Sequence, residues 1–500
     1  MLPRVYRPSA GSALRIPART AGRPSAPRWS RPYTNRGGSS SSFRAPQLIG
    51  VFLLSGAGGW GVSSLLRDGK KGKSSGAIPS LGPGPVDLEA LAKSPVDGGS
   101  FAKADAKLRE DVFVGSFSAA GKDTHVHAAR VASNHPVEDY MAYSLAPGVG
   151  GSQTLFNGVY DGHAGWATSL LLKSALIPAV STSIARLRPG TDAAAVDAAV
   201  VKAFTDLDDL IMSNAAKAVD GLEAGAVEPA DSAVMAAIAP AIAGSCALLS
   251  VFDPATSTVR VACTGDSRAV LGSAAPGSAS YSAVELSKDQ TGRNRDEFDR
   301  ISKEHPGEEG IIDQKSGRLF GIAVTRAFGD HRWKWTEDSI KHAHLNFFGT
   351  TPRPKYATPP YMTAAPVVTT TEVRGPDFVI LASDGLWDHI SSEHAVECVS
   401  RWISAKKAGE KTPADKLARD PGAPSAFDMA GGWPDWSATP EHFVVEDLDN
   451  AAVHLIKNAL GGRRRSLFTG AALAYPPLSR NVRDDVTVQV IFFQDPSKEN

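Results

Sequence analysis

Four aspartates stand where runs of apolar, strand-forming residues begin or end, and this pattern constrains the fold more than any other feature. Asp161 follows the run 155–160, Asp266 follows 259–265, Asp384 follows 378–383, and Asp484 precedes 486–493. A carboxylate at the tip of a buried strand is held rigidly at the rim of a sheet. Several such tips meeting at one end of a sheet would form an all-oxygen cage, which suits Mg²⁺ or Mn²⁺.

Glycine directly follows two of these aspartates, in Asp161-Gly162 and Asp384-Gly385. Glycine permits a tight turn and lets a metal or another backbone approach closely. A single Asp-Gly pair is first of all a turn dipeptide. The four aspartates together, in this order, therefore carry the prediction of a metal site.

Seven sequence blocks resemble those of the metal-dependent protein serine/threonine phosphatases, the type 2C or PPM family. They are residues 136–139, 159–165, 244–247, 264–268, 325–330, 381–388 and 483–488. The resemblance covers about residues 130 to 493. Segments 304–306, 318–319 and 326–335 are most similar to the mitochondrial pyruvate dehydrogenase phosphatase branch and its fungal relatives.

The order of apolar and helical segments agrees with the fold that this resemblance implies. We predict a strand over 155–160, helices over 166–180 and 192–217, and a hairpin that joins 244–252 to 258–263. The implied class is α+β: a central antiparallel β-sandwich flanked by helix pairs, in four layers α/β/β/α. We expect one phosphatase domain over 101–495, with a surface excursion near 331–366 and a partly ordered insertion near 404–447.

The resemblance also implies a ligand set for two metal ions. Asp161 would bridge both ions and the Gly162 carbonyl would ligate one, while Asp384 and Asp484 complete the sphere of the first. Two ligands would act through bound waters: Glu138 and Asp139. A third, weaker ion would involve Asp266, Asp388 and Asp384.

Two of these assignments have structural alternatives. His163 resembles the general acid of the family, although a lone histidine is more often structural. Asp388 could instead cap the helix that we expect to begin near Ser391.

One position departs from the pattern of many family members. Asn134 stands where they carry an arginine that grips the substrate phosphate, a change shared by the pyruvate dehydrogenase phosphatase branch. The sequence therefore does not identify the residue that binds the substrate phosphate. Arg130 and Arg326 are candidates, with structural salt bridges as the alternative for each.

The N-terminal region has a composition of its own. Every charged residue before position 68 is arginine, which together with abundant serine predicts a mitochondrial transit peptide over 1–46. A disordered basic tail is the alternative. Residues 48–66 are nineteen uncharged residues, eight of them Gly or Ser, so a single inner-membrane anchor over 47–67 and a flexible extension both fit. We favour the anchor, followed by a flexible linker over 68–100.

Charge narrows the class of partner. Without the ten arginines before position 68, the chain has 43 basic and 53 acidic residues, a net charge of about −10 that argues against nucleic acid. The expected activity is hydrolysis of phosphoserine and phosphothreonine in proteins, in mitochondria. On resemblance alone, the phosphorylated α subunit of pyruvate dehydrogenase is the expected substrate. The alternative function is an inactive phosphatase-fold scaffold, which would have lost metal carboxylates that this chain retains.

Overall fold

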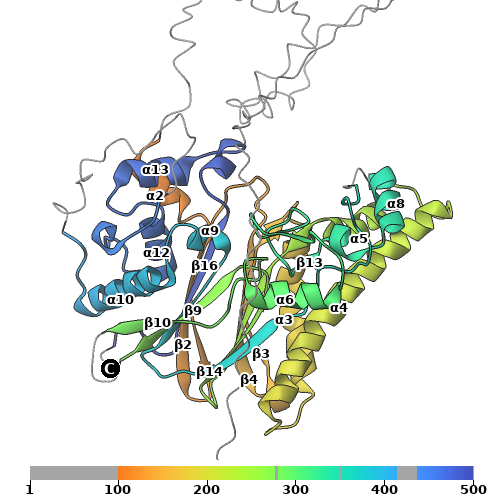
Figure 1. Cartoon of the computed structure of the whole chain (residues 1–500). Coiled ribbons are helices and arrows are strands. Elements are labelled where there is room, and N and C mark those ends of the chain that lie inside the picture. Colours follow the sequence, from red (N-terminus) through yellow and green to blue (C-terminus); the bar gives the residue numbers. More distant parts are fainter. Residues whose placement is uncertain (1–98, 276–279, 348–350, 414–435, 499–500) are drawn as a thin grey trace, which may run out of the picture. The chain divides into compact units, whose positions relative to one another are not determined.

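The structure is a computed structural model that describes residues 99–275, 280–347, 351–413 and 436–498 (Figure 1). The transit peptide, the anchor and all but the last two residues of the linker lie outside the described residues. Ser100, at the end of the expected linker, is the N-cap of helix α2 (Phe101–Lys107).

Two antiparallel sheets form the centre of the domain. The six-stranded sheet has the order β1 (Val112–Ala119), β2 (Lys122–Val131), β16 (Val486–Phe492), β15 (Phe378–Ala382), β9 (Arg268–Ala274) and β10 (Tyr281–Glu285). The five-stranded sheet has the order β14 (Val367–Glu372), β8 (Thr258–Thr264), β7 (Ala247–Asp253), β4 (Gln153–Tyr160) and β3 (Tyr140–Pro147). The apolar runs that precede Asp161, Asp266 and Asp384 and that follow Asp484 are therefore strands.

The two sheets pack face to face around a shared apolar core. Val159 and Leu248 of the five-stranded sheet belong to the same buried cluster as Leu381 and Ile491 of the six-stranded sheet. These strands are buried on both faces, which is why their sequences are continuous apolar runs instead of alternating ones.

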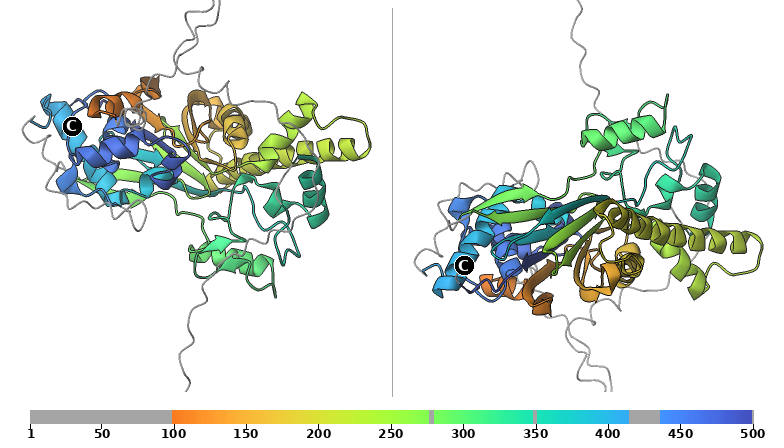
Figure 2. Two further views of the ribbon diagram at one scale, coloured as in Figure 1. Left: turned by 90° about the horizontal axis from the view of Figure 1, so that it is seen from above. Right: turned by 90° about the horizontal axis from the view of Figure 1, so that it is seen from below.

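Helices cover the outer face of each sheet, as Figures 1 and 2 show. Helices α3 (Ala167–Ala185) and α4 (Ala193–Glu223) pack with α5 (Ser232–Ile242) in the apolar cluster on the five-stranded sheet. Helices α10 (Ser392–Ala408), α12 (Ala451–Ala459) and α13 (Arg465–Leu473) pack with α2 on the six-stranded sheet. The predicted four-layer α/β/β/α arrangement is confirmed.

Local signals place the helix ends. Asp192 caps α4, where its side chain accepts the N–H of Ala195 at 2.9 Å. Gly409 ends α10 with a φ of 69°, which glycine adopts without strain. Both α3 and α4 extend beyond the C-terminal ends that we predicted, because Ile184 and Val219 continue the apolar faces that pack in the core.

A small third sheet adjoins the five-stranded sheet, since one residue separates β5 from β4 and one separates β6 from β7. Its order is β13 (Phe328–Gly329), β6 (Gly244–Ser245) and β5 (Gly162–His163). The strand predicted over 244–252 is thus divided: its first two residues join this small sheet and the rest forms β7. In this sheet Gly244 pairs with His163 on one side and with Gly329, the residue before Asp330, on the other.

The segment 331–366 is not a simple surface excursion. It contains α7 (His331–Lys334) and α8 (Glu337–Phe347), and its side chains Trp333, Ile340 and Tyr361 are buried. They form a separate apolar cluster with Ile301 of α6 (Arg295–Glu304) and with Leu319 of the short hairpin β11 (Ile312–Asp313) and β12 (Arg318–Leu319). Sequence patterning missed this cluster because the apolar residues have no regular spacing.

The described part of the insertion expected over 404–447 consists of its two ends. Its first residues continue helix α10, and residues 414–435 lie outside the described residues. After that gap Trp436, Ala438 and Phe443 are buried in the core of the helical layer. The 3-10 turn Pro440–His442 lies in the same segment.

Among the described residues, α3 is the one helix long and apolar enough to cross a membrane. It packs against the five-stranded sheet, with Leu172, Leu176 and Val180 fully buried. Burial in the core accounts for its apolar composition.

Candidate metal centre and active site

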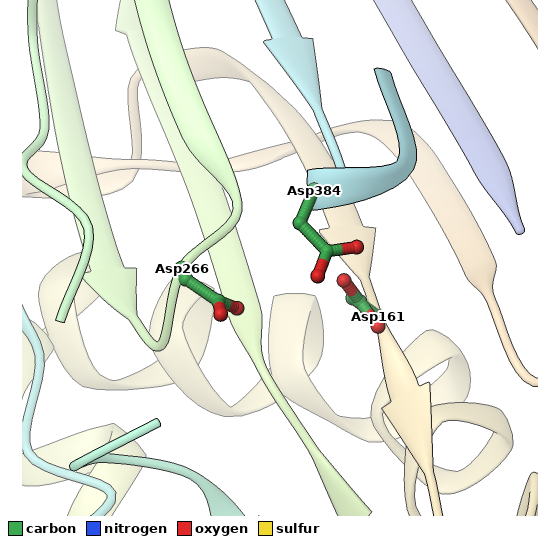
Figure 3. A group of neighbouring side chains, drawn as sticks. All are labelled: Asp161, Asp266 and Asp384. Carbon is green, nitrogen blue, oxygen red and sulfur yellow. The ribbon is translucent and has the colours of Figure 1, made fainter. Parts of the chain in front are cut away.

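Three of the predicted aspartates converge at one end of the sandwich (Figure 3). Asp161 directly follows β4, Asp266 lies between β8 and β9, and Asp384 begins the short helix α9 (Asp384–Trp387) after β15. One carboxylate oxygen from each lies within 4.8 Å of the other two. Both sheets therefore contribute to the cluster.

The cluster is electrostatically suited to a cation. Burial raises the pKa of all three carboxyl groups, and the Asp384 charge raises those of Asp161 and Asp266 further, the latter to about 7. Oδ2 of Asp161 is buried and has no hydrogen-bond partner among the described residues. Buried polar atoms normally have partners, so an acceptor-only cluster with an unpaired oxygen fits a hard divalent cation.

Cys246 holds the first two aspartates in place, a role that sequence reasoning missed. Its backbone N–H donates to the Asp161 carbonyl at 2.8 Å, and its thiol donates to Oδ1 of Asp266 at 3.3 Å. The backbone of Gly265 is held in turn by Gln290, whose Oε1 accepts its N–H at 2.7 Å. The only sequence signal was that Cys246 lies in one of the seven blocks.

Glu138 and Asp139 lie in a loop that is held by Asp485, a second residue that sequence reasoning missed. Oδ2 of Asp485 accepts the N–H groups of Glu138 at 2.8 Å and of Asp139 at 3.2 Å. Its Oδ1 accepts the N–H groups of Ser133 and Asn134. Burial and the Asp485 charge raise the pKa of Asp139 to about 7, although Thr487 donates to its Oδ2 at 2.7 Å.

Glu138 also contacts the turn after Asp161. Its Oε1 accepts the N–H of Gly165 at 2.6 Å, and its backbone carbonyl accepts a hydrogen bond from Ser169. A Cβ atom on Gly162 would collide with that same carbonyl oxygen. The glycine after Asp161 is therefore required for the close approach of the two loops.

Asp484 lies beside this centre but not within the group of three. Its carboxylate pairs with Arg480 and its side chain is 30% exposed. A Cβ atom on Gly385 would lie 3.3 Å from the Cβ of Asp484, which places Asp484 against the turn that carries Asp384. The predicted ligand is thus adjacent to the cluster.

Asp388 is exposed at the C-terminal end of α9. It does not cap the next helix, since the N-cap of α10 is Ser391, whose side chain accepts the N–H of His394 at 3.2 Å. That structural alternative is therefore wrong. Asp388 and Asp484 both line one cavity of about 430 Å³.

His163 pairs with a carboxylate that the sequence did not reveal. Its Nε2 lies 2.6 Å from Oδ2 of Asp330, a buried residue with a φ of 53°. Burial alone would lower the pKa of His163, but the charge and hydrogen bond of Asp330 raise it above its ordinary value. The pair is therefore suited to holding a proton on the imidazole beside the carboxylate cluster.

Gly244 of β6 lies against this pair. A Cβ atom at this position would collide with Nε2 of His163 and with Oδ2 of Asp330. The absence of a side chain therefore lets the histidine and the aspartate meet.

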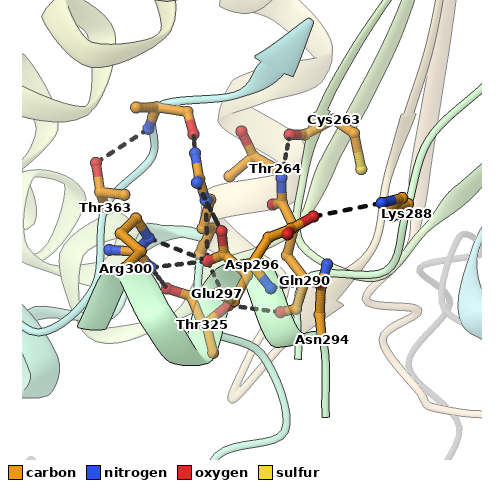
Figure 4. Close-up of polar contacts among 12 residues, drawn as sticks. Cys263, Thr264, Lys288, Gln290, Asn294, Asp296, Glu297, Arg300, Thr325 and Thr363 are labelled. Atoms are coloured by element: carbon orange, nitrogen blue, oxygen red, sulfur yellow. Dashed lines mark hydrogen bonds and ion pairs between the residues drawn. The ribbon is translucent and has the colours of Figure 1, made fainter. Parts of the chain in front are cut away.

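Arg130 and Arg326, the two candidates for gripping phosphate, are both engaged in the framework. Arg130 pairs with Asp111 and donates to the Asp139 carbonyl. Arg326 pairs with buried Glu297 at 2.6 Å and donates to the Ala365 carbonyl at 2.7 Å. Figure 4 shows Glu297 at the centre of this network, where Arg300 and Thr325 also bind it. The alternative structural role therefore holds for both arginines.

The family model of Protein phosphatase 2C matches residues 132–424, more than half of the chain. The chain belongs to the protein phosphatase 2C family. The protein is therefore a protein serine/threonine phosphatase, an enzyme of a family that is metal-dependent in general.

Curated phosphatase 2C relatives are similar over most of the chain. A protein phosphatase 2C homolog of Schizosaccharomyces pombe is 37% identical over 73% of this chain and 79% of its own length. The mitochondrial pyruvate dehydrogenase (acetyl-transferring) phosphatase 1 of Saccharomyces cerevisiae is 34% identical over 73% of this chain and 68% of its own. A solved serine-threonine phosphatase 2C from Toxoplasma gondii is 18% identical, with a TM-score of 0.42, over 77% of this chain and 99% of that one.

Proposed function

We propose that this phosphatase hydrolyses phosphoserine and phosphothreonine in proteins at a binuclear Mg²⁺ or Mn²⁺ centre. The observation that carries the proposal is the convergence of Asp161, Asp266 and Asp384, with an unpaired buried oxygen on Asp161. When bound, the two ions supply an activated water and neutralise charge on the phosphoryl group.

Different residues would bind the ions directly, bind them through water, or bind a third ion. Asp161 would be shared by both, and the Gly162 carbonyl and the Asp384 and Asp484 carboxylates would complete the set. Glu138 and Asp139, which Asp485 fixes in place, would contribute through waters. Asp266 and Asp388 would join Asp384 around a third ion.

His163 would donate the proton that the leaving serine or threonine oxygen requires. It adjoins the cluster in sequence and in space, because β5 begins directly after Asp161. Asp330 orients the imidazole and stabilises its protonated form. These are the requirements for a general acid.

The proposed substrate is the phosphorylated α subunit of pyruvate dehydrogenase, in mitochondria. Support comes from the names of the Saccharomyces cerevisiae relative and of human relatives, which are mitochondrial pyruvate dehydrogenase phosphatases. The arginine-rich, acid-free start of the chain supports the same compartment.

Mn²⁺-dependent hydrolysis of a phosphothreonine peptide tests the activity. The full-length chain should hydrolyse the peptide, Asp161→Asn should not, and Asp206→Asn on the exposed face of α4 should match the wild type. Equal measurable rates for wild type and Asp161→Asn would reject the proposed centre. No hydrolysis by either protein would favour the scaffold alternative.

Substrate and location need separate tests. Catalytic efficiency should be higher on phosphorylated pyruvate dehydrogenase than on an unrelated phosphoprotein or a sugar phosphate. Protease protection of tagged protein in intact and swollen mitochondria should place the domain in the matrix. Exposure of the domain outside the inner membrane would count against this substrate.

A further inference from the structure

The inference concerns how the enzyme binds the substrate phosphate, and it rests on the proposed function. Asn134 cannot supply a positive charge, and its Nδ2 donates to Glu138. Arg130 and Arg326 are engaged with Asp111 and Glu297. A dianionic phosphoryl group bound beside several carboxylates needs a cation besides the metal ions.

Arg480 is a cation at the edge of the carboxylate cluster. It pairs with Asp484, and its side chain is 45% exposed. Its partner Asp484 lies against the turn that carries Asp384, so the guanidinium lies beside the centre itself. The guanidinium therefore faces both the proposed metal ligands and solvent.

The backbone that carries Arg480 is fixed beside the position of Asn134. Arg480 belongs to the 3-10 turn η3 (Leu478–Asn481). In this turn Ser479 is buried, and its hydroxyl donates to the Ser133 carbonyl at 2.5 Å. Arg483 continues the attachment by donating to the Ala132 carbonyl at 2.8 Å. The backbone of residue 480 therefore lies beside the segment that precedes residue 134.

Space for a substrate group lies at the same place. The cavity of about 430 Å³ is lined by Arg480 together with Asp388, Asp484 and Trp436. A cavity of this size accommodates a phosphorylated side chain. The guanidinium has five N–H donors in a planar fork, so it can contact Asp484 and a phosphoryl oxygen at once.

We propose that Arg480 binds the phosphoryl group of the substrate and takes the place of the arginine that Asn134 replaces. The positive charge is supplied from the C-terminal segment of the chain instead of from residue 134.

The test compares full-length Arg480→Ala and Arg480→Lys with Arg188→Ala, which removes an exposed arginine from the loop between α3 and α4. Loss of a charge-assisted hydrogen bond should raise KM for a phosphothreonine peptide and the inhibition constant of inorganic phosphate by about tenfold or more. Calorimetric titration of inorganic phosphate should show the same weakening. Arg480→Lys should recover part of the affinity, and Arg188→Ala should match the wild type.

Mn²⁺ titration separates this role from a merely structural one. Removing a cation beside Asp484 should leave Mn²⁺ affinity unchanged or increase it, whereas a loosened centre would bind Mn²⁺ more weakly. Unchanged phosphate binding in Arg480→Ala would overturn the inference. So would a phosphate effect that disappears at saturating Mn²⁺, or an equal effect of Arg188→Ala. A wild type without Mn²⁺-dependent hydrolysis would instead reject the proposed function.

Discussion

Nε2 of His163 lies 2.6 Å from Oδ2 of Asp330, although 167 residues separate them in the chain. The small sheet of β13, β6 and β5 brings them together. Asp330 is buried, so its carboxylate is held in one position while the imidazole remains partly open to solvent. This pairing fixes the orientation of the imidazole beside the carboxylate cluster.

Replacement of His163 should affect substrates according to their leaving group. We expect His163→Gln to lower kcat on a phosphothreonine peptide by about 100-fold or more, the usual contribution of a general acid. Hydrolysis of p-nitrophenyl phosphate should fall far less, because nitrophenolate leaves without protonation. Steady-state kinetics on both substrates measure the difference.

Asp330→Asn should show the same preference more weakly, because the imidazole remains but loses the carboxylate that orients it. Asp338→Asn, an exposed change on α8, is the control and should leave both rates unchanged. Equal losses on the two substrates would contradict a role in proton donation and indicate a general structural defect.

Asp161→Asn should separate metal binding from folding. Loss of the shared carboxylate should lower activity by about 1,000-fold, since a metal centre contributes several kcal/mol to transition-state stabilisation. Without metal the variant should be no less stable than the wild type, because one of three mutually repelling, partly buried carboxylates is neutralised. Thermal unfolding with and without Mn²⁺ measures this, and a variant still stabilised by Mn²⁺ like the wild type would contradict it.

The neighbouring aspartates Asp484 and Asp485 should give opposite results. Asp485→Asn should lower the free energy of unfolding by about 2 kcal/mol, since buried hydrogen bonds to a charged group weaken. Asp484→Asn should change stability by less than about 0.5 kcal/mol, because Asp484 is partly exposed. It should nevertheless weaken Mn²⁺ binding. Urea unfolding and Mn²⁺ titration of both variants check the contrast, and similar stability losses would refute it.

Glu297 should make an acid-sensitive contribution to stability. Burial alone would raise the pKa of Glu297, but hydrogen bonds from Arg326 and Arg300 lower it from 4.5 to about 2. Because the folded-state pKa is the lower one, the stabilisation is present above pH 4.5 and is lost as the pH falls toward 2. Glu297→Gln should therefore destabilise the protein at neutral pH by about 3 kcal/mol, the effect of breaking a buried ion pair.

The difference between wild type and Glu297→Gln should be smaller at about pH 4 than at about pH 7. Urea unfolding at both pH values measures it. Glu304→Gln, which removes a more exposed partner of Arg300, is the control and should have a small effect at either pH. A pH-independent gap for Glu297→Gln would contradict the assigned ion pair.

The parts of the fold that sequence predicts are those with a local signal. Buried strands are continuous apolar runs, and aspartates at their ends predicted that Asp161, Asp266 and Asp384 would meet. The confirmed sandwich follows from the same runs. Asp484 was predicted as a ligand from its place before β16, and the structure sets it beside the cluster, paired with Arg480.

The residues that sequence reasoning missed act through contacts between distant segments. Asp485 accepts backbone N–H groups from residues about 350 positions away, and no spacing rule reveals such bonds. Asp330 has a left-handed backbone conformation that ordinary patterns do not predict. Arg326 was a candidate for phosphate binding because the sequence does not show its ion pair with Glu297, which lies on another element.

The lack of space around Gly244 provides a way to recognise disabled relatives from sequence alone. Any side chain there would collide with both the imidazole and its carboxylate, although none of the proposed metal ligands would be replaced. A homologue with the full set of aspartates but alanine or a larger residue at this position should keep its ions and lose turnover. A prediction of activity based only on the presence of the aspartates would wrongly class such a protein as active.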